Sequence, residues 1–529
     1  MTSLDLNQPQ ASAALCARRG ASRAAVFADA DILRLATLLF LLPNALFAAR
    51  LGPAASIPLL LGSAGALAIL WRPTADGVSA LAEPVDLAAL SLAFALALAL
   101  CLLGGETHLF YANADWLARD GVLHDLSKRF YPVFYRYQDQ DYVMRAPLGM
   151  YMTPALVGGF LGLNAAHLAL LAQNAALLAA ILYLLARLAR PHAALVVPLI
   201  AAFSGLDIVP TLVMAAARRL HEGVWPHIGH IEWWAVHVQY SSHVTQLFWA
   251  PNHALPGWQI ALLILLHARR EIDFAALLAS FSPLLFWAPL PMVGALPALA
   301  LFGLAQGPRG LVSPRPLLAL LSGLCFLPMA FFLTRDAGDN PHRLLLGLPD
   351  YWPLYGLFLL VEIPQGLLLA CNWNRIERRD RGALAVSLAV LLILPAFEFG
   401  HSNDLAMRAS IPPLFLLAFA FARLCASLLQ AKEKSGLALA AGMIVILGAA
   451  TPGLEIARTF LPAYAISDCN FLTTWRKSAP KSNGANYLSR LESMPEWLVS
   501  RSDHAASERE TIEDRRCWPD HPLLEDARK

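Results

Sequence analysis

The stretch LAALSLAFALALALCLLGGETHLFYANADW, residues 87–116, joins two segments of opposite character. Its apolar part ends at Gly104 and is about twenty residues long, enough for a helix to cross the hydrocarbon core of a bilayer. The polar part opens a region that holds Asp115, Asp120 and Asp125, with His124 among them. A membrane helix that leads into an acidic segment indicates either an ordinary solvated loop or a reaction site at the membrane surface.

The composition of the whole chain is typical of a polytopic membrane protein. Of its 529 residues, 57% are hydrophobic and 15% are charged, and the mean hydropathy is +0.52. Soluble domains rarely depart so far from average usage. The formal net charge of +2 is divided among the loops and forms no basic stripe, which argues against a nucleic-acid-binding protein.

Apolar windows of about 15 to 22 residues, separated by charged or Pro/Gly-rich breaks, predict an all-α fold with about 11–13 transmembrane helices. A transmembrane domain over 33–453 is expected between an N-terminal segment, 1–32, and a small polar C-terminal tail, 454–529. The predicted spans are 33–50, 55–71, 86–104, 165–189, 193–206, 257–268, 274–289, 290–304, 316–333, 351–371, 383–399, 410–429 and 437–453.

The distribution of Arg and Lys predicts which side of the membrane each connection faces. One set of alternate short connections is basic throughout, from Arg18 and Arg19 to Lys432 and Lys434, and the positive-inside rule makes that set cytoplasmic. With an uncleaved first helix and an odd number of spans, the N-terminus lies inside and the C-terminus outside. We therefore expect a multi-pass protein of the plasma (inner) membrane with long outer loops at 105–150 and 207–256.

Two motifs in the first outer loop carry a family resemblance. NADW places Asp115 just after a membrane helix, and RAPLG, beginning at Arg145, precedes a Pro-containing apolar helix. Over roughly residues 86–260 this layout resembles the GT-C class of membrane glycosyltransferases, of the protein mannosyltransferase or aminoarabinose transferase type. Two features depart from that pattern, because three spans rather than one precede the loop and the usual paired acids are not adjacent.

The resemblance implies a substrate class and a fold. The sugar donor would be linked to a polyprenyl phosphate, the acceptor would be a lipid, glycan or protein, and membrane lipids would surround the site. Juxtamembrane helices are expected in the large outer loops. The stretch WLARDGVLHDL, residues 116–126, has apolar residues near helical spacing and charged residues mostly on the other face, which predicts a surface-lying helix.

The chemistry of sugar transfer supplies a role for Asp115. Inversion at a sugar carbon needs a base that takes the proton of the acceptor hydroxyl, and a partly desolvated carboxylate suits that role. The alternative is a helix cap, because Asn and Asp are favoured capping residues and NAD precedes a helical stretch. Asp125 and Asp207, the latter at the outer end of another span, are further candidate acids, whereas Asp120 and His124 are interpreted mainly as surface residues.

The second outer segment, residues 218–258, is dense in histidine and tryptophan. His227 and His230, with Glu232 nearby, suggest a metal site, but the segment has no HExxH or comparable spacing, so a divalent ion is only an alternative. A wall that contacts sugar and lipid is the preferred hypothesis, and an interfacial aromatic belt is the simpler one. The residues proposed for that wall are His243, Gln246, Trp249 and His253.

Two later positions complete the candidate site. Asp404 and Arg408 are four residues apart at the top of a span, so they share a helix face. An arginine there suits a lipid phosphate, as does Arg145 of the first loop, and a local Asp–Arg ion pair is the alternative for Arg408. Glu362 lies in the middle of a predicted span, where an ionisable group suggests either a functional site or a brace beside Pro364.

The cysteines and the rival functions leave alternatives open. None of the seven cysteines forms a CxxC pair, and Cys469 and Cys517 of the tail could form a disulfide in an oxidising compartment.

A transporter or flippase would hold polar residues at the membrane midplane in broken helices, often in repeated halves. The sequence shows no internal repeat, and Glu362 is its main midplane candidate. A non-catalytic subunit of an envelope assembly is the third possibility.

Overall fold

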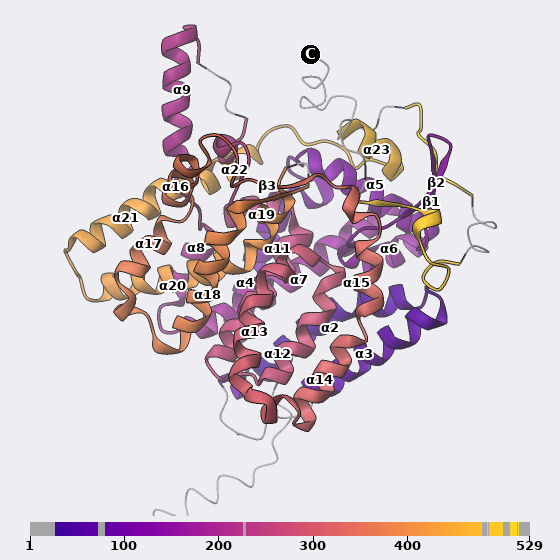
Figure 1. Cartoon of the computed structure of the whole chain (residues 1–529), viewed down its shortest axis with the longest axis horizontal. Coiled ribbons are helices and arrows are strands. Elements are labelled where there is room, and N and C mark those ends of the chain that lie inside the picture. Colours follow the sequence, from indigo (N-terminus) through magenta and orange to yellow (C-terminus); the bar gives the residue numbers. More distant parts are fainter. Residues whose placement is uncertain are drawn as a thin grey trace, which may run out of the picture.

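The computed structural model describes residues 27–71, 80–225, 229–400, 402–478, 484, 486–500, 508–515 and 517. Of the described residues, 71% are helical and few lie in strands. The helices pack into one body whose upper end, in the view of Figure 1, carries α5, α19, α23 and two small sheets. We call this end the loop face.

The bounds of the elements follow the chain from α2 to η8. The helices of the body are α2 (Asp29–Ala48), α3 (Pro53–Trp71), α4 (Leu87–Leu103), α7 (Leu163–Leu188), α8 (Ala193–Ala201), α11 (Pro251–Ala268), α12 (Phe274–Phe281), α13 (Pro289–Leu311), α14 (Pro314–Leu324), α15 (Leu327–Thr334), α16 (Tyr351–Glu362), α17 (Pro364–Cys371), α18 (Arg378–Ile393), α20 (Ile411–Gln430), α21 (Gly436–Gly448) and α22 (Ala450–Arg458). The connecting segments form α5 (Ala114–Arg129), α6 (Gly149–Leu161), α9 (Ile208–Glu222), α10 (His243–Trp249), α19 (Asp404–Ala409) and α23 (Phe471–Ser478). The short 3-10 turns are η1 (Ala80–Ala82), η2 (Glu106–His108), η3 (Ile231–Ala235), η4 (Ser282–Phe286), η5 (Ala337–Asp339), η6 (Trp373–Arg375), η7 (Leu394–Ala396) and η8 (Leu491–Ser493).

Every one of the thirteen predicted spans coincides with helix, but fewer of them are long and apolar enough to cross a membrane. Among the described residues 7 helices pass that test, or up to 8 if the bent pair α16–α17 counts as one span. The difference from the predicted 11–13 arises because some segments form short helices. α8 has 9 residues and is about 14 Å long, against about 30 Å of hydrocarbon.

The exposed side chains of the helical body indicate a membrane protein. Apolar side chains such as Leu61 and Ile446 are 62% and 74% exposed, whereas α11 and α20 lie in the interior and are buried along nearly their whole length. Many large apolar side chains are exposed in this way, which suits a lipid environment. The chain is therefore an all-α polytopic membrane protein in outline.

Ion pairs tie the helices together at the end opposite the loop face. Arg187 Nε of α7 lies 2.6 Å from Asp29 Oδ2 of α2, and Arg269 Nη2, after α11, lies 2.5 Å from Asp380 Oδ2 of α18. Arg375 Nη1 lies 2.8 Å from Glu433 Oε2. Arg187, Arg269 and Arg375, which the sequence assigns to cytoplasmic connections, thus lie at one end of the body, away from α5 and α19.

A proline sets the break between α16 and α17. Pro364 has no N–H to continue the hydrogen-bond ladder and disfavours helical geometry in the residue before it. Ile363 accordingly leaves the helix with φ −130° and ψ 48°. The two helices are bent by 78°, and Glu362 is the last residue of α16.

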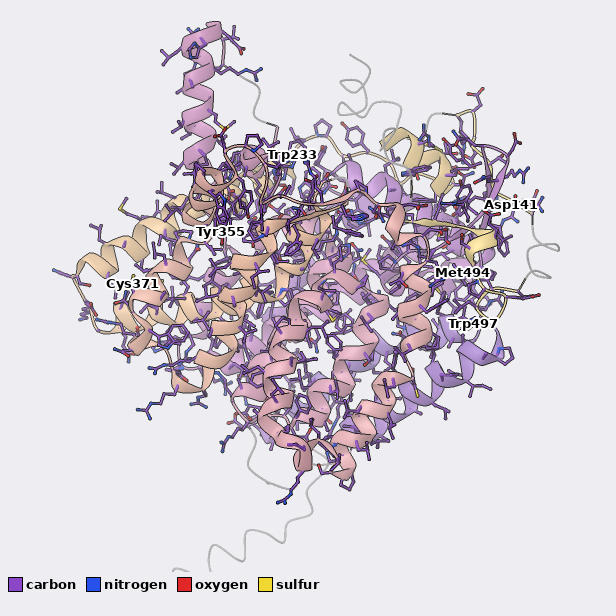
Figure 2. The ribbon with its side chains drawn as sticks, in the orientation of Figure 1. Asp141, Trp233, Tyr355, Cys371, Met494 and Trp497 are labelled. Atoms are coloured by element: carbon purple, nitrogen blue, oxygen red, sulfur yellow. A yellow bond between two sulfur atoms is a disulfide. The ribbon has the colours of Figure 1, made fainter. Side chains whose placement is uncertain are left out.

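The first loop is more than a set of surface helices. After α5 it forms a hairpin of β1 (Phe134–Tyr137) and β2 (Gln140–Met144), and β2 also pairs with β5 (Leu488–Arg490) of the tail. A second small sheet joins β3 (His342–Leu344) to β4 (Phe397–Phe399). Figure 2 shows Asp141 of β2 and Met494 of the tail on one side of the molecule and Tyr355 on the other.

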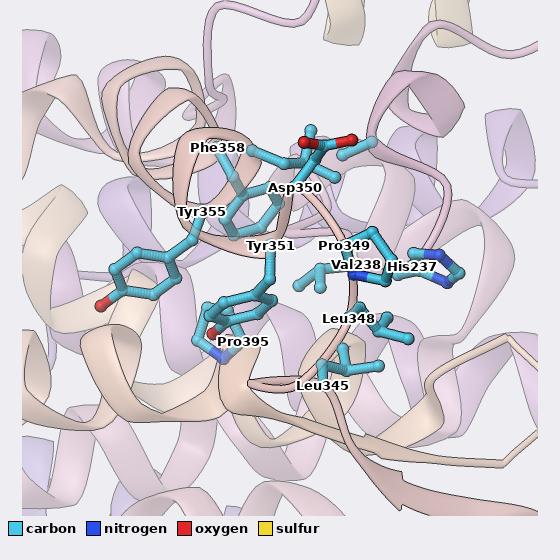
Figure 3. A pocket seen from close by; sticks show the side chains of 12 residues that line it. His237, Val238, Leu345, Leu348, Pro349, Asp350, Tyr351, Tyr355, Phe358 and Pro395 are labelled. Carbon is cyan, nitrogen blue, oxygen red and sulfur yellow. The ribbon is translucent and has the colours of Figure 1, made fainter.

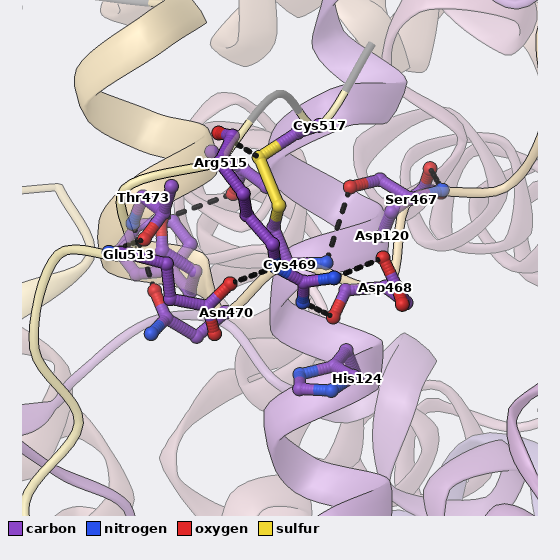
Figure 4. The surroundings of a disulfide bond; sticks show 12 residues. Asp120, His124, Ser467, Asp468, Cys469, Asn470, Thr473, Glu513, Arg515 and Cys517 are labelled. Carbon is purple, nitrogen blue, oxygen red and sulfur yellow. Dashed lines mark hydrogen bonds and ion pairs between the residues drawn. A yellow bond between two sulfur atoms is a disulfide. The ribbon is translucent and has the colours of Figure 1, made fainter.

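The tail covers the polar face of α5, so the prediction of a solvated face there is wrong. Asp120 and Asp125 are fully buried. Asp120 Oδ2 accepts from the backbone N–H of Ser467 (2.9 Å) and Asp125 Oδ2 from that of Phe471 (2.9 Å). Cys469 lies between these anchors and is bonded to Cys517 (Figure 4). The predicted disulfide is formed, and the described part of the tail is ordered against the loop face.

Candidate functional site

Asp115 stands at the start of α5 with its side chain 48% exposed. The predicted alternative, that Asp115 caps the helix, is wrong: Asn113 is the N-cap, and its side chain accepts from the Asp115 backbone N–H (3.0 Å). The Asn113 amide also donates to the Phe248 carbonyl (2.9 Å), which fixes the start of α5 against α10. The Asp115 carboxylate is therefore free of capping duty and faces the surface.

Arg119 brings a buried positive charge next to Asp115. Its Nη2 lies 3.6 Å from Asp115 Oδ2, donates to the Trp249 carbonyl, and the guanidinium stands 5.2 Å from the centroid of the Trp116 ring. The side chain is only 7% exposed, and among the described residues Nη1 has no hydrogen-bond partner. A buried cation whose charge is only partly matched favours an anion beside it.

Asp404 and Arg408 form a second pair, as the spacing predicts. Arg408 Nη1 is hydrogen-bonded to Asp404 Oδ1 across one turn of α19, and 23% of the Arg408 side chain is exposed. Asn403 caps α19 by accepting from the Ala406 N–H (3.3 Å). Asn486 of the tail donates to Asp404 Oδ2 (3.2 Å), so the tail reaches this pair as well.

Tyr487 and His253 lie within electrostatic range of both pairs. Burial raises the pKa of the Tyr487 hydroxyl, which also feels four surrounding charges: Arg119, Asp115, Arg408 and Asp404. Burial, followed by the positive charges of Arg408 and Arg119, holds the pKa of His253 well below its ordinary value. His253 is therefore a neutral imidazole that donates or accepts a hydrogen bond without adding charge.

These six residues come from four separate parts of the chain and form the candidate site. We call it the polar mouth, and its members are Asp115, Arg119, His253, Asp404, Arg408 and Tyr487. Two cations, two carboxylates, a phenol and a neutral imidazole meet at the loop face. Such a set suits a ligand that carries a phosphate and a polar, uncharged group.

Arg145 contacts the polar mouth through its backbone. Its backbone N–H donates to the Tyr487 carbonyl (2.7 Å), and its guanidinium donates to the Leu333 carbonyl (3.2 Å). Burial lowers the pKa of Arg145 to about 10, against the opposing effect of Asp336 and Asp339. Arg145, which the sequence predicts to bind the donor phosphate, thus lies next to Tyr487, the residue just before strand β5 of the tail.

Of the residues predicted to form the sugar-facing wall, the structure brings two to the mouth and packs two elsewhere. His253 belongs to the polar mouth, and Trp249 borders it through its contact with Arg119, while the indole donates to Glu455 Oε2 (2.8 Å). His243 is fully buried between aromatic rings, with Nδ1 2.6 Å from the Ile200 carbonyl. Gln246 is also buried; its Oε1 accepts from Trp258 Nε1 (2.9 Å) and its Nε2 donates to the Ser241 carbonyl.

Asp125 has contacts typical of a structural anchor. Besides the Phe471 N–H, its carboxylate accepts from the Tyr135 hydroxyl (2.7 Å) and lies 2.9 Å from His124 Nδ1. Asp120 is held in the same way, with His108 Nε2 at 3.1 Å. Burial raises the pKa of Asp125. We therefore favour a structural role for Asp125 over the predicted catalytic one.

Asp207 and Glu362 belong to a second, buried cluster together with Glu232. Trp234 Nε1 donates to both Asp207 Oδ1 (3.2 Å) and Glu362 Oε1 (3.0 Å). Glu232 Oε1 accepts from Thr245 Oγ1 (2.7 Å), and burial, followed by the charge of Asp207, raises the pKa of Glu232 to about 8. Carboxyl groups this close and this buried cannot all ionise, so the cluster holds protons at neutral pH.

The described residues contain no group of three or more His, Cys, Asp or Glu side chains that could hold a metal ion. His227, one of the predicted ligands, lies outside the described residues. His230 is instead packed against the Trp233 ring, with ring centroids 5.0 Å apart.

An apolar cavity lies beside the polar mouth and not within it. Its volume is about 200 Å³, and one wall is Tyr351, Tyr355 and Phe358 of α16 (Figure 3). The opposite rim includes His237 and Val238. This apolar cavity and the polar mouth are distinct features, and the charged chemistry belongs to the mouth.

Sequence reasoning missed three important residues. Arg119 counted only as one more basic residue of a long loop, and Tyr487 and Asn486 belong to a tail in which the sequence singled out no site residue. The signal available was the pair of cysteines in the tail, whose disulfide closes a loop within it and indicates that the tail is ordered. Comparison with protein-family models, with curated proteins and with solved structures gives no match to this chain.

Proposed function

We propose that the protein is a membrane glycosyltransferase that moves a sugar from a polyprenyl-phosphate donor to an acceptor, with the polar mouth as its active site. The observation that carries this proposal is an exposed carboxylate, Asp115, paired with Arg119, in a region where Tyr487 also feels the charge of Arg408. A lipid-linked donor presents a phosphate at the membrane surface, and guanidinium groups bind its oxygens. The layout of the first loop, which resembles the GT-C class, supports the same conclusion.

The reaction divides the roles within the mouth. The acceptor hydroxyl oxygen forms a bond to the anomeric carbon of the sugar while the bond from that carbon to the phosphate oxygen breaks. Asp115 takes the proton of the hydroxyl, and the electron pair of the broken bond leaves on the polyprenyl phosphate. Arg408 and Arg119 stabilise the negative charge that builds up on that phosphate.

The neutral groups of the mouth orient the sugar. His253, uncharged because of burial and the nearby arginines, and Tyr487 offer hydrogen bonds to sugar hydroxyls. Trp249 lies at the border and offers an aromatic surface for a sugar ring. The acceptor is a lipid, glycan or protein that reaches the mouth from the aqueous side.

The proposed sidedness places the loop face outside the cell. The basic residues gathered at the opposite end fit a cytoplasmic position under the positive-inside rule, and a disulfide persists in an oxidising compartment. With this orientation the protein is a multi-pass plasma (inner) membrane enzyme whose N-terminus is cytoplasmic and whose tail is extracytoplasmic.

The direct test is sugar transfer in proteoliposomes with a panel of labelled polyprenyl-phosphate sugars. Asp115→Asn keeps the shape of the side chain and should lower the transfer rate by roughly 10²- to 10⁴-fold. Asp139→Asn, in the exposed β1–β2 turn, is the matched control and should keep full activity. Retained transfer in Asp115→Asn overturns the assignment. Parallel assays with Mg²⁺ and with a chelator decide whether a divalent ion takes part.

A transporter is the second candidate, and the buried cluster favours it. Glu362 ends α16 at a 78° break, and buried acids at broken helices are typical of proton- or ion-coupled transport. In that case proteoliposomes should accumulate solute without any lipid-linked donor, and Glu362→Gln should abolish the accumulation. The same vesicles would show no sugar transfer.

A further inference from the structure

The apolar cavity beside the polar mouth has the character of a site for a hydrocarbon chain. Rings of Tyr351, Tyr355 and Phe358 form one wall, and Leu345 and Leu348 form another (Figure 3). Its volume of about 200 Å³ is below the range of roughly 300–1,000 Å³ that encloses a whole small ligand. It therefore fits a segment of a longer molecule.

The cavity also offers one unsatisfied polar group. The Tyr351 hydroxyl is buried and has no hydrogen-bond partner among the described residues. The only charged side chain in the lining belongs to Asp350, at the end where α16 begins. A sugar would need many hydrogen-bonding groups, which this lining does not have, whereas an apolar chain needs none.

A short structural path joins the cavity to the polar mouth. The carbonyl of His237, a rim residue of the cavity, accepts from Asn403 Nδ2 (3.0 Å). Asn403 is the N-cap of α19, and Arg408 follows on the same short helix. The rise from Asn403 to Arg408 along that helix is about 7 Å. A lipid phosphate at Arg408 would thus have this cavity within reach of its first chain carbons.

The outer side of α16 faces the lipid-exposed surface. Leu357 and Leu360 of this helix are 48% and 56% exposed, although Tyr351 and Phe358 are buried toward the cavity. A chain that leaves the cavity along α16 therefore enters apolar surroundings. α16 thus has the cavity on one side and exposed apolar side chains on another.

We propose that this cavity binds the isoprenoid chain of the donor lipid at the end nearest its phosphate. This inference rests on the proposed function, because it takes the phosphate of a polyprenyl lipid to lie at Arg408. Specificity for an isoprenoid follows from the wall of flat rings, against which branched, unsaturated units pack closely.

The test is photocrosslinking with a polyprenyl phosphate that carries a diazirine on its first isoprene units and no sugar. Crosslinks should map to α16 and to residues 345–350. Leu348→Trp fills the cavity and should lower this labelling at least tenfold, while Leu346→Trp, two residues away and outside the lining, should leave it unchanged. Leu348→Ala should keep the labelling, which separates blocking from misfolding.

Competition identifies the lipid. Unlabelled polyprenyl phosphate should displace the probe, and phosphatidylglycerol vesicles at equal phosphate concentration should not. Equal displacement by the phospholipid, labelling outside the cavity, or equal labelling of the two Trp variants overturns the proposal. Because the probe has no sugar, Asp115→Asn should still be labelled, so a failure of the transfer assay is distinguishable from a failure of this inference.

Discussion

Substitution of Asp125 tests most directly how the tail is held to the loop face. In Asp125→Ala, the Tyr135 hydroxyl and the Phe471 N–H both lose their acceptor while they stay buried. An unsatisfied buried donor costs about 1–3 kcal/mol, so the two together should destabilise the docked tail by about 2–6 kcal/mol. Even the lower value raises the population of the undocked tail by roughly 30-fold.

Asp125→Asn should cost far less, because an amide keeps one oxygen for the same two donors. Its NH₂ group then faces His124 Nδ1, 2.9 Å from the present carboxylate oxygen, and the imidazole accepts in its other tautomer. The expected loss is below about 1 kcal/mol. The docked tail should therefore be least stable in Asp125→Ala, more stable in Asp125→Asn and most stable in the unchanged protein. This order follows from the hydrogen-bond geometry and not from charge alone.

Hydrogen–deuterium exchange of the detergent-solubilised protein measures this directly. The amides of α23, and Phe471 above all, should exchange faster in Asp125→Ala than in Asp125→Asn, with the disulfide intact in both. Asp139→Ala in the exposed β1–β2 turn is the matched control. Equal exchange in Asp125→Ala and Asp139→Ala, or an Asn variant as labile as the Ala variant, refutes the reasoning.

Three further predictions concern the donor phosphate, the disulfide and pH. Arg408→Gln should weaken polyprenyl phosphate binding by about 1.5–3 kcal/mol, seen as a 10- to 100-fold rise in the concentration that displaces a photoreactive lipid, and Arg408→Lys should recover part of it. Cys469→Ser should make the tail sensitive to protease. The crosslink spans a sequence separation of 48, and its loss should favour the undocked chain by up to about 4 kcal/mol, because that chain regains conformational entropy. The raised pKa of Glu232, about 8, means that the folded protein binds an extra proton between the ordinary carboxyl range and pH 8. Thermal stability should therefore fall as pH rises through that window and stay low above it, and Glu232→Gln should flatten the profile; an unchanged slope in Glu232→Gln contradicts this.

Local patterns in the sequence were enough to predict the helical elements. Thirteen apolar windows coincide with helix, and the i, i+4 spacing of Asp404 and Arg408 correctly puts them in contact. These features depend on periodicity and short-range geometry, which a single sequence contains. The number of membrane crossings depends instead on how long each helix stays straight, and α8 and the α16–α17 break show that apolar composition alone does not determine it.

The composition of the polar mouth could not be predicted, because it depends on contacts across the whole chain. Arg119 gains its importance from the Trp249 carbonyl, 130 positions away, and Tyr487 from a tail that β5 attaches to β2. In the same way Asp120 was interpreted as a surface residue and Asp125 as a candidate acid because the tail that covers both lies more than 300 positions later. Amphipathic spacing shows that a helix has a polar face, but not whether that face meets water or another segment.

Asp115 of the polar mouth and the carboxyl groups of the buried cluster suit different chemistry, because they differ in their access to solvent. Asp115 is about half exposed and lies beside Arg119, so its carboxylate is accessible to a substrate from the aqueous side. Glu232 is buried, and its raised pKa keeps it protonated at neutral pH, so it cannot act as a base there. In the proposed transfer reaction, the base is therefore expected in the polar mouth and not in the buried cluster. The buried cluster at the helix break either braces α16 against η3 or carries protons. A transfer assay on Asp115→Asn and an uptake assay on Glu362→Gln separate these roles, since each mechanism predicts that the other variant stays active.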